Sequence, residues 1–383
     1  MASTDTNTSR PDEIFRLYEP KRKKSMKVGI VGCGKMAEQH ARQIKRIPGA
    51  TIVGVCDIEI LMAKQLAERF GIRAYFTDLS EMLETIELDV IHITTPPHSH
   101  FALAKLALAA GCHVYVEKPF TLNTAEAEAL IAFAKQKGRK ITAGHNAQFT
   151  HAMIRMREMV TQGYLGGPPI HMECHYCYEL GDASYVKAFL GDRDHWLRQL
   201  PGSLLQNIIS HGISKIAEFL VGENPLVIAH GFASPFLVNI GESAIIDEVR
   251  VIIKDDVSTT AYFTFSTQLR PALHQLRLCG PKRTLIVDDD HQILCKMNNK
   301  EYKSYLQYFI PPLGFAGQYI GNWGRNLLKF LANDFHLPND AGLKRLIEAF
   351  YLSITNDAPL PLSYNEILLT ARIMDAIFSQ IKR

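Results

Sequence analysis

The stretch from Met26 to Ala37, Met-Lys-Val-Gly-Ile-Val-Gly-Cys-Gly-Lys-Met-Ala, most constrains what this chain can fold into. Its apolar run is typical of a buried parallel strand, and a helical pattern begins near Lys35. Gly32 allows a tight turn, and Gly34 lets the backbone approach a pyrophosphate without a Cβ in the way. Ala37 is small enough for a helix to pack closely on the strand. The stretch therefore predicts a strand, a phosphate-binding turn and a helix whose N-terminus faces the anion.

A second apolar strand, over residues 51–56, ends in Asp57. A carboxylate at this spacing is expected to hydrogen-bond the ribose diol of adenosine. It would also repel a 2′-phosphate, so the pattern favours NAD over NADP. The alternative is that Asp57 caps the helix that begins near Glu59, because aspartate is a good N-cap residue.

Strand and helix patterns alternate from this turn to about residue 143. Six strands in about 120 residues predict an α/β fold with a parallel, doubly wound Rossmann sheet and right-handed crossovers. Ligands of such sheets bind beyond the carboxyl ends of the strands. The residues expected at those ends are Gly32–Met36, Asp57, Thr94–His100, Glu117–Pro119 and Asn146.

Composition and charge exclude several classes of protein. The chain has 383 residues, enough for two cores, and its net charge of +3 gives no basic face for nucleic acid. No run is long enough to span a membrane, and residues 1–25 are polar, without the apolar segment of a secretory signal. We expect these 25 residues to be a disordered tail. The seven cysteines form no disulfide framework, so a reducing compartment, the cytoplasm, is expected.

Cys174 and Cys177 form the one cysteine pair with the spacing of metal ligands. In a strand over residues 170–178, side chains three apart point to opposite faces, so these thiols would not converge. No second pair of this spacing completes a tetrahedral site. We therefore expect no metal centre.

Three motifs together resemble the Gfo/Idh/MocA family of NAD(P)-dependent sugar and inositol oxidoreductases. They are Gly-Cys-Gly-Lys-Met-Ala with His40 after it, residues 95–100 (Thr-Pro-Pro-His-Ser-His), and residues 117–119 (Glu-Lys-Pro), in the family's order and at its usual separations. The resemblance is strong over residues 26–146 and thins beyond. It implies that NAD is held by Gly32, Gly34, Lys35, Met36, Asp57, Thr94, Thr95, Pro96, His100, Glu117, Lys118 and Asn146.

The resemblance also implies a second domain. We expect an NAD-binding Rossmann domain over residues 26–146 and an α+β domain over residues 147–383, built on a large, mostly antiparallel open sheet. The face of that sheet often makes the oligomer interface in the family, so a homo-oligomer, a dimer or a tetramer, is expected. The sequence agrees on its own terms, because short β-rich segments separated by Gly, Pro and Asp clusters run from residue 225 to 288.

Lys118 is the candidate acid/base group. It follows an apolar strand, where desolvation and a cationic nicotinamide ring would lower its pKa towards the working range. The alternative is a lysine that extends from the strand end into solvent. In the family pattern Glu117 holds the nicotinamide ribose, and the Lys118–Pro119 bond is cis.

Asn207 and His211 stand where most family members have an aspartate and a histidine on one helical face. Asn207 can hydrogen-bond a sugar hydroxyl but cannot accept a proton, so base chemistry would rest on Lys118 and His211. Ser214 also stands where the family usually has an aspartate. The alternative for His211 is a hydrogen-bonded core histidine.

The pair His195-Trp196 resembles a substrate-loop element of the polysaccharide-linked members of the family. Trp196 could stack on the apolar face of a sugar, or it could belong to the core. Tyr176 is expected to line the same pocket, together with Tyr178 and His175.

Three functions are consistent with these residues. The first is a dehydrogenase that acts on a free, nucleotide-linked or glycosidic sugar. The second is an NAD-dependent glycosidase or lyase that oxidises C3 transiently, and the third is a cofactor-binding sensor without turnover. The retention of Lys118 and His211 favours the first, whereas Asn207 in place of the family's carboxylate favours the other two.

Overall fold

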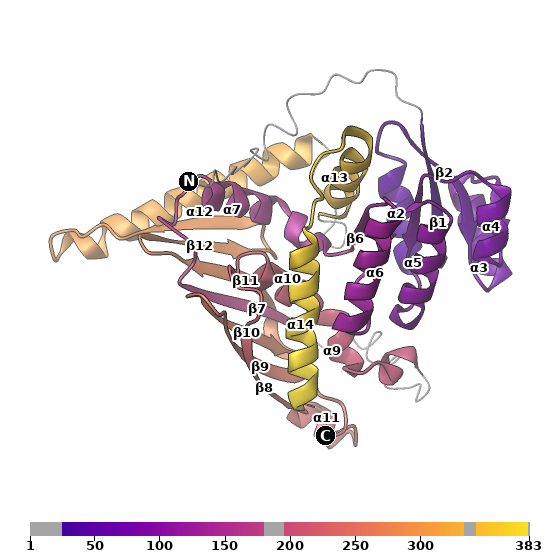
Figure 1. The fold of residues 1–383 in the computed structure, drawn as a ribbon. Helices are drawn as coiled ribbons and strands as arrows, with labels where there is room; N and C mark the ends of the chain where they lie inside the picture. The colour runs from indigo at the N-terminus through magenta and orange to yellow at the C-terminus, as the bar shows by residue number, and fades with distance from the viewer. Residues whose placement is uncertain (1–24, 180–194, 333–341, 382–383) are drawn as a thin grey trace, which may run out of the picture.

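The computed structural model describes residues 25–179, 195–332 and 342–381. The predicted polar tail, residues 1–25, therefore lies outside the described residues except for Ser25. Figure 1 shows two sheets side by side, with helices between and around them.

The first sheet has six parallel strands in the order β3-β2-β1-β4-β5-β6. This order confirms the predicted doubly wound Rossmann fold. Its inner strands are buried on both faces, which is why they are mostly apolar in sequence, with His92 as a buried polar exception. The strands are β1 (Met26–Val31), β2 (Ala50–Cys56), β3 (Ala74–Phe76), β4 (Val90–Ile93), β5 (His113–Val116) and β6 (Ile141–Ala143).

Two helices of this part begin at a residue whose side chain caps them, and one ends at a left-handed glycine. Asp78 accepts a hydrogen bond from the backbone of Glu81 at 2.9 Å, as predicted, and Gly71 ends its helix in the left-handed conformation with φ 65°. Asn123 caps the last helix of the series in the same way as Asp78. These helices are α2 (Lys35–Ile44), α3 (Ile60–Phe70), α4 (Leu79–Thr85), α5 (His100–Ala109) and α6 (Thr124–Gln136).

The second sheet has seven strands in the order β13-β12-β11-β7-β10-β9-β8. Neighbouring strands are antiparallel except for β7 and β10, so the prediction of a large, mostly antiparallel sheet is confirmed. The last of these strands in the sequence was not predicted. The strands are β7 (His171–Glu179), β8 (Leu226–Phe232), β9 (Glu248–Lys254), β10 (Thr260–Ser266), β11 (Gln268–Cys279), β12 (Arg283–Asp288) and β13 (Ile293–Asn298).

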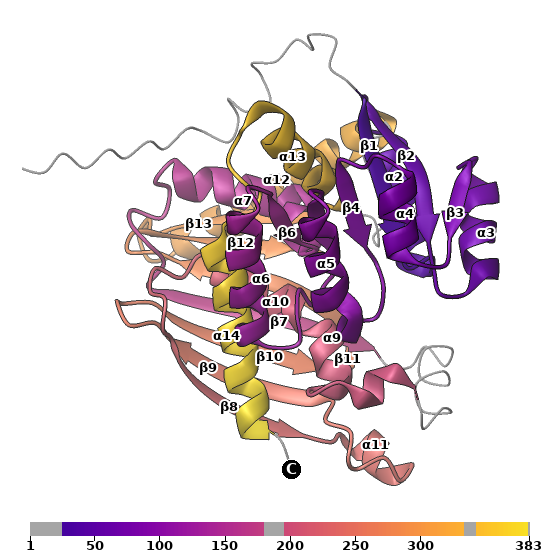
Figure 2. The ribbon, with the colours of Figure 1, turned by 45° about the vertical axis from the view of Figure 1, so that its right-hand side comes forward.

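One face of the second sheet is covered by helices. Side chains of α7 (His151–Thr161), α10 (Ser210–Ala217) and α14 (Tyr364–Ile381) form a buried core with the inward residues of the strands. Figure 2 shows α14 running along this sheet, and the same helix also contacts α6 of the first part. Two short helices, α9 (Ser203–Ile208) and α11 (Pro235–Asn239), lie in the lower part of the molecule as drawn in Figure 1.

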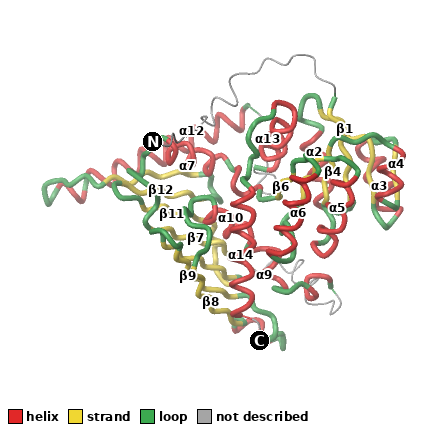
Figure 3. The backbone as a smooth tube through the Cα atoms, in the orientation of Figure 1, coloured by secondary structure: helices red, strands yellow, loops and turns green. Residues whose placement is uncertain are grey.

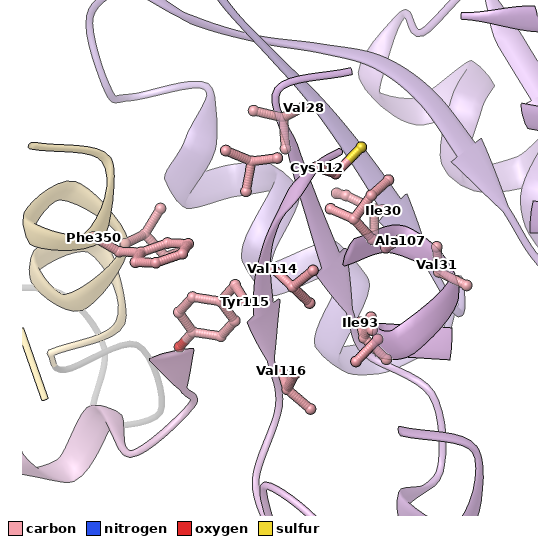
Figure 4. Packing of buried hydrophobic residues seen from close by; sticks show 14 of the residues in the cluster. Val28, Ile30, Val31, Ile93, Ala107, Cys112, Val114, Tyr115, Val116 and Phe350 are labelled. Atoms are coloured by element: carbon pink, nitrogen blue, oxygen red, sulfur yellow. The ribbon is translucent and has the colours of Figure 1, made fainter. Parts of the chain in front are cut away.

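Helix α13 (Leu343–Asn356) comes late in the sequence but packs on the first sheet. Its Phe350 is fully buried against Tyr115 of β5, with ring centroids 6.3 Å apart (Figure 4). The C-terminal part of the chain therefore contributes to the core of the nucleotide-binding sheet. The division of the chain at residues 146 and 147 remains a prediction.

Helix α12 (Ile310–Leu331) lies along the outer edge of the second sheet, beside β13 (Figure 3). The sequence predicted a helix over residues 319–335, but the helix begins nine residues earlier, and residues 333–335 lie outside the described residues. Pro311 and Pro312 lie at the start of the helix. They occupy the first turn of the helix, where a missing N–H removes no hydrogen bond. No helix among the described residues is long and apolar enough to cross a membrane.

Candidate active site

A cavity of about 1410 Å³ lies between the two sheets. It is bounded on one side by the carboxyl ends of the first-sheet strands and on the other by β7, β11, α9 and α10. Most of the predicted site residues line it. They are Gly32, Gly34, Lys35, Met36, Asp57, Thr94, Thr95, Pro96, Glu117, Lys118, Asn146, Tyr176, Trp196, Asn207 and His211.

The glycine turn makes an open cradle at this cavity. Gly32 has φ 87°, and a Cβ there would lie 2.6 Å from the Thr95 side chain, so glycine is required on steric grounds. A Cβ on Gly34 would meet no described atom within 4 Å, so the backbone here faces free space at the start of α2. A diphosphate fits this arrangement of a bare backbone and a helix N-terminus.

Asp57 shapes the same cradle. Its Oδ2 accepts a hydrogen bond from the backbone N–H of Cys33 at 2.6 Å, and its Oδ1 accepts one from Glu59 at 2.9 Å. The N-cap position of α3 is Glu59 itself, so Asp57 acts one step before the helix rather than as its cap. Each carboxylate oxygen keeps a further acceptor site, so Asp57 is compatible with the expected contact to a ribose diol.

The motif of residues 94–100 ties the loops of the cavity together. Thr94 Oγ1 donates to the carbonyl of Gly32 at 2.6 Å. His100 is fully buried, and its two ring nitrogens lie 2.8 Å and 2.9 Å from the carbonyls of Thr95 and Pro119. The structure does not bring His100 to the cavity; it lies behind the wall and links the two motifs.

Lys118 lies between the two halves of the cavity. Its Nζ donates to the Asn207 carbonyl oxygen at 2.9 Å and lies 3.2 Å from Asn207 Oδ1. Burial lowers the pKa of Lys118, and the neighbouring Glu117 carboxylate offsets only part of that effect. This is the direction expected for a lysine at the end of an apolar strand. The Lys118–Pro119 peptide bond is cis, as the family pattern implied.

Glu117 begins a buried chain of hydrogen bonds that runs away from the cavity. Its Oε1 lies 2.8 Å from His40 Nε2, His40 Nδ1 lies 2.8 Å from His92 Nδ1, and His92 Nε2 lies 2.7 Å from the Tyr351 hydroxyl of α13. One arrangement satisfies every atom: Tyr351 donates to His92, His92 to His40, and His40 to the carboxylate. Burial would raise the pKa of Glu117, but the hydrogen bond from His40 and the charge of Lys118 lower it overall.

Asn207 and His211 both reach the cavity, from two helical segments. Helix α9 ends at Ile208 and α10 begins at Ser210, but Ile209 between them keeps right-handed helical angles (φ −68°, ψ −17°), so Asn207 and His211 lie one helical turn apart. His211 Nδ1 is buried and has no hydrogen-bond partner among the described atoms. Burial, reinforced by the charge of Lys118, lowers the pKa of His211 well below its usual 6.5, so its imidazole is neutral near pH 7.

The predicted substrate residues differ in position. Tyr176 and Trp196 line the cavity. His195 does not; its Nδ1 accepts a hydrogen bond from Leu197 at 3.3 Å at the start of a short 3-10 helix. Tyr178 lines the cavity and donates to the Tyr176 hydroxyl at 3.2 Å, whereas His175 is not among the lining residues.

Sequence reasoning missed four polar residues of the substrate side. His274 Nδ1 lies 2.7 Å from Asp290 Oδ1, and the His274 ring packs edge-on against Tyr176. Lys215 forms an ion pair with Asp289, which also accepts a hydrogen bond from Thr150 at 3.0 Å. The three aspartates at the end of the strand over residues 283–288 were a usable signal, but nothing in the sequence connects His274 with them.

No group of three or more His, Cys, Asp or Glu side chains in the described ranges is arranged to hold a metal ion. The thiols of Cys174 and Cys177 donate hydrogen bonds to different parts of the chain, to the carbonyl of Gly212 in α10 at 3.6 Å and to that of Thr264 in β10 at 3.5 Å.

Comparison with known proteins agrees with this geometry. Residues 26–145 match the family model described as an oxidoreductase family with an NAD-binding Rossmann fold. The matching segment is the NAD-binding domain described by the Gfo/Idh/MocA family model. The resemblance noted in the sequence is thereby confirmed, and residues 26–145 are an NAD-binding Rossmann fold.

Two curated relatives match somewhat more than a third of this chain in sequence. D-apiose dehydrogenase of Paraburkholderia graminis is 30% identical over 145 residues, which are 38% of this chain and 39% of that protein. UDP-N-acetylglucosamine 3-dehydrogenase of Acidithiobacillus ferrooxidans is 35% identical over 133 residues, 35% of this chain and 41% of its own length. The matched segments thus span about two fifths of these relatives.

The fold is shared over nearly the whole length. An NAD binding oxidoreductase from Klebsiella pneumoniae superposes with a TM-score of 0.74 at 20% identity, covering 94% of this chain and 97% of the other. The WlbA dehydrogenase from Bordetella pertussis, crystallised with NADH and UDP-GlcNAcA, gives a TM-score of 0.74 at 16% identity, covering 94% and 96%. At such low identities, the superpositions show a common fold and nothing further.

Proposed function

We propose that this chain is an NAD-dependent oxidoreductase that transfers a hydride between nicotinamide and a secondary hydroxyl of a sugar or sugar derivative. One observation carries the proposal: the partly buried Lys118, with its lowered pKa, joins the nucleotide-binding sheet to Asn207 on the substrate side of one continuous cavity. The cavity exceeds the roughly 300–1,000 Å³ of a site for a single drug-sized ligand. A cofactor and a sugar can therefore be held together.

The cofactor would be held by the residues of the nucleotide-binding sheet that line the cavity. The bare backbone at Gly34 and the start of α2 suit its diphosphate, and Asp57 suits the adenosine ribose. Glu117, kept ionised by His40, suits the second ribose. When bound, NAD would supply the hydride acceptor.

Three side chains where the two walls meet, one from the first sheet and two from α9 and α10, supply the remaining requirements. Neutral Lys118 can take the proton of a sugar hydroxyl, and the neutral imidazole of His211 can accept a proton at its unpartnered Nδ1. Asn207 cannot accept a proton, so we assign it the role of orienting Lys118 and the substrate.

The substrate is a sugar in free, nucleotide-linked or glycosidic form. Trp196 and the aromatic group of Tyr176 and Tyr178 can contact apolar ring faces, while His274 and Asp290 can bind hydroxyls. Relatives whose names include D-apiose dehydrogenase and UDP-N-acetylglucosamine 3-dehydrogenase support this class.

A second candidate, a glycosidase or lyase that oxidises its substrate transiently, draws on one observation. The pair His274–Asp290 gives the cavity an additional imidazole, oriented by a carboxylate, beyond Lys118 and His211. Such a reaction needs a further proton acceptor, which a simple dehydrogenase does not.

Incubation with a panel of free, nucleotide-linked and aryl-glycosidic sugars and NAD⁺ tests both. Net NADH is expected for the dehydrogenase. Release of the aglycone without net NADH would replace it with the second candidate. Saturable binding of cofactor and sugar with neither product would reject both in favour of a sensor.

A further inference from the structure

Helix α12 turns a polar face toward the protein and an apolar face toward solvent, which is the reverse of an ordinary surface helix. Its polar side chains point at the protein. Gln318 accepts a hydrogen bond from the backbone N–H of Lys296 at 2.7 Å and donates to its carbonyl at 3.0 Å, and Asn322 makes the same pair of contacts with Leu294 at 3.2 and 3.1 Å. These two amides, one turn apart, cover the free edge of β13. Asn326 adds a hydrogen bond to the His291 carbonyl at 2.9 Å.

The outward side of this segment is apolar. A solvated helix places its apolar stripe on the core and its polar residues outside. Here twelve large apolar side chains are between 39% and 79% exposed, and no Asp or Glu occurs between residues 302 and 331. They are Tyr305, Tyr308, Phe309, Ile310, Leu313, Tyr319, Ile320, Trp323, Leu327, Leu328, Phe330 and Leu331.

The helix is fixed in this orientation by its polar contacts. Arg155 of α7 donates to Asn322 at 2.9 Å, and Lys329 lies 2.6 Å from His151 at the start of α7. Rotating α12 to bury its apolar face would break these contacts and uncover the edge of β13. The apolar face is therefore a feature of the folded chain, and none of the described residues covers it.

We propose that the outward face of α12 is the contact surface with a second copy of this chain. Leu313, Ile320 and Leu327 recur every seven residues and form a ridge. Beside that ridge lies a groove made by glycines spaced three and four apart, at residues 314, 317, 321 and 324. Two identical helices related by a two-fold axis place each ridge in the other's groove, so one surface satisfies both copies.

The exposed area is sufficient for such an interface. At roughly 200 Å² per large side chain, about half exposed, the twelve residues offer on the order of 1,000 Å². A stable interface of standard size takes roughly 800 Å² from each partner. The aromatic content, including Trp323 at 66% exposed, matches the composition of interface cores.

The distribution of charge favours a protein partner over a membrane surface. A helix that lies on a membrane carries lysine and arginine on its solvent-facing side, next to the lipid headgroups. Lys329 instead faces α7 of its own protomer, as described above. Arg325 is the one other basic residue of α12 and is exposed, so the helix carries a single solvent-facing cation and not the row of lysines and arginines that binds anionic lipid.

The glycine groove gives a selective test. Cβ atoms on Gly317 and Gly324 would meet no described atom within 4 Å, and both glycines are helical, so Gly317→Leu and Gly324→Leu are tolerated by the protomer. In the proposed dimer, the new leucine side chains fill the glycine groove of both copies, because the two-fold axis makes the two grooves equivalent. We expect the dimer dissociation constant, measured for the full chain by analytical ultracentrifugation, to rise roughly 100-fold or more for the double variant. Circular dichroism and thermal unfolding establish that it is folded.

The control is Ile228→Lys together with Ile252→Lys. These residues are 54% and 48% exposed and face each other on the open side of the second sheet, the surface expected from the family resemblance to make the oligomer. If assembly uses α12, the Ile228→Lys and Ile252→Lys control still forms an oligomer through α12. The glycine double variant loses that oligomer. Dissociation by the control with no effect of the glycine variant would overturn the proposal. So would a parent chain that stays monomeric at micromolar concentration, whether or not it binds anionic vesicles.

A fluorescence measurement reports on the same contact. The chain has two tryptophans, so Trp196→Phe leaves Trp323 as the sole emitter. On dilution through the dissociation constant, its emission should shift to longer wavelength. An emission maximum that is already that of a solvated indole at high concentration would exclude α12 from the interface.

Discussion

Replacing Asn207 by aspartate tests the site most directly, because it is nearly isosteric and restores the residue usual in the family. In the structure, Lys118 Nζ lies 3.2 Å from Asn207 Oδ1, so the change places a carboxylate against the ammonium group. It also places a charge in reach of His211, whose protonated form it would stabilise. Both effects favour protonated bases and raise their pKa values.

The magnitude follows from that separation. Two unit charges about 4 Å apart attract by about 4 kcal/mol at an effective dielectric constant of 20. If solvent screening leaves half of this, about 2 kcal/mol, the fraction of neutral Lys118 falls about 30-fold at any pH on the rising limb of activity. The low-pH limb of kcat/KM should therefore move to higher pH, while activity on the plateau is largely retained.

The assay is the pH profile of kcat/KM on one active sugar for the parent chain and Asn207→Asp. Two variants serve as controls. Asn207→Ala leaves the backbone carbonyl that Lys118 also uses, so it should raise KM more than it lowers kcat. His211→Ala should depress kcat more strongly. An unmoved limb in Asn207→Asp, with His211→Ala nearly silent, would show that α9 and α10 are a packed helix and that the chemistry lies elsewhere.

Three further predictions concern the cofactor, the base and the buried chain of hydrogen bonds. NAD(H) should bind more tightly than NADP(H). Asp57→Ser should reduce that preference and weaken the binding of both cofactors, because Asp57 also accepts the hydrogen bond of the Cys33 amide. Calorimetric titration that gave equal affinities for the parent chain would refute the role of the carboxylate. Lys118→Ala should reduce kcat by at least ~10²-fold with little change in cofactor affinity, and turnover close to the parent's would reject Lys118 as the base. Tyr351→Phe leaves His92 Nε2 buried without its donor and should cost about 1–3 kcal/mol in urea unfolding, whereas an unchanged midpoint would mean that water replaces the hydroxyl.

Local sequence patterns were sufficient to predict the strands and helices of the nucleotide-binding half, because the residues that determine each element lie within a few positions of each other. The glycines, the apolar strands, the cap at Asp78 and the end at Gly71 each act on neighbouring backbone. Their order along the chain then fixes the sheet, since parallel strands require crossovers of one hand. The same locality explains why the sequence placed Gly32 and Lys118 at the carboxyl ends of strands, where both line the cavity.

Contacts between distant segments were beyond such patterns. His100 carries a family motif yet lies behind the cavity wall, because its partners, the carbonyls of Thr95 and Pro119, are set by how two loops pack. His274 and Lys215 carry no local signal; pairing of β11 with β7 and the position of α10 bring them to the cavity.

The sequence alone thus determined the strand, turn and helix of the cofactor cradle and the residue types of the proposed chemistry, because short-range sterics and capping decide them. The tertiary structure alone decided three things: that Glu117 is connected through His40 and His92 to Tyr351, that a second imidazole–carboxylate pair faces Lys118 across the cavity, and that α12 turns its polar side inward. Each depends on which surfaces far apart in the chain can be buried together. Residue periodicity reports that a helix has two faces, but only packing decides which face meets the protein.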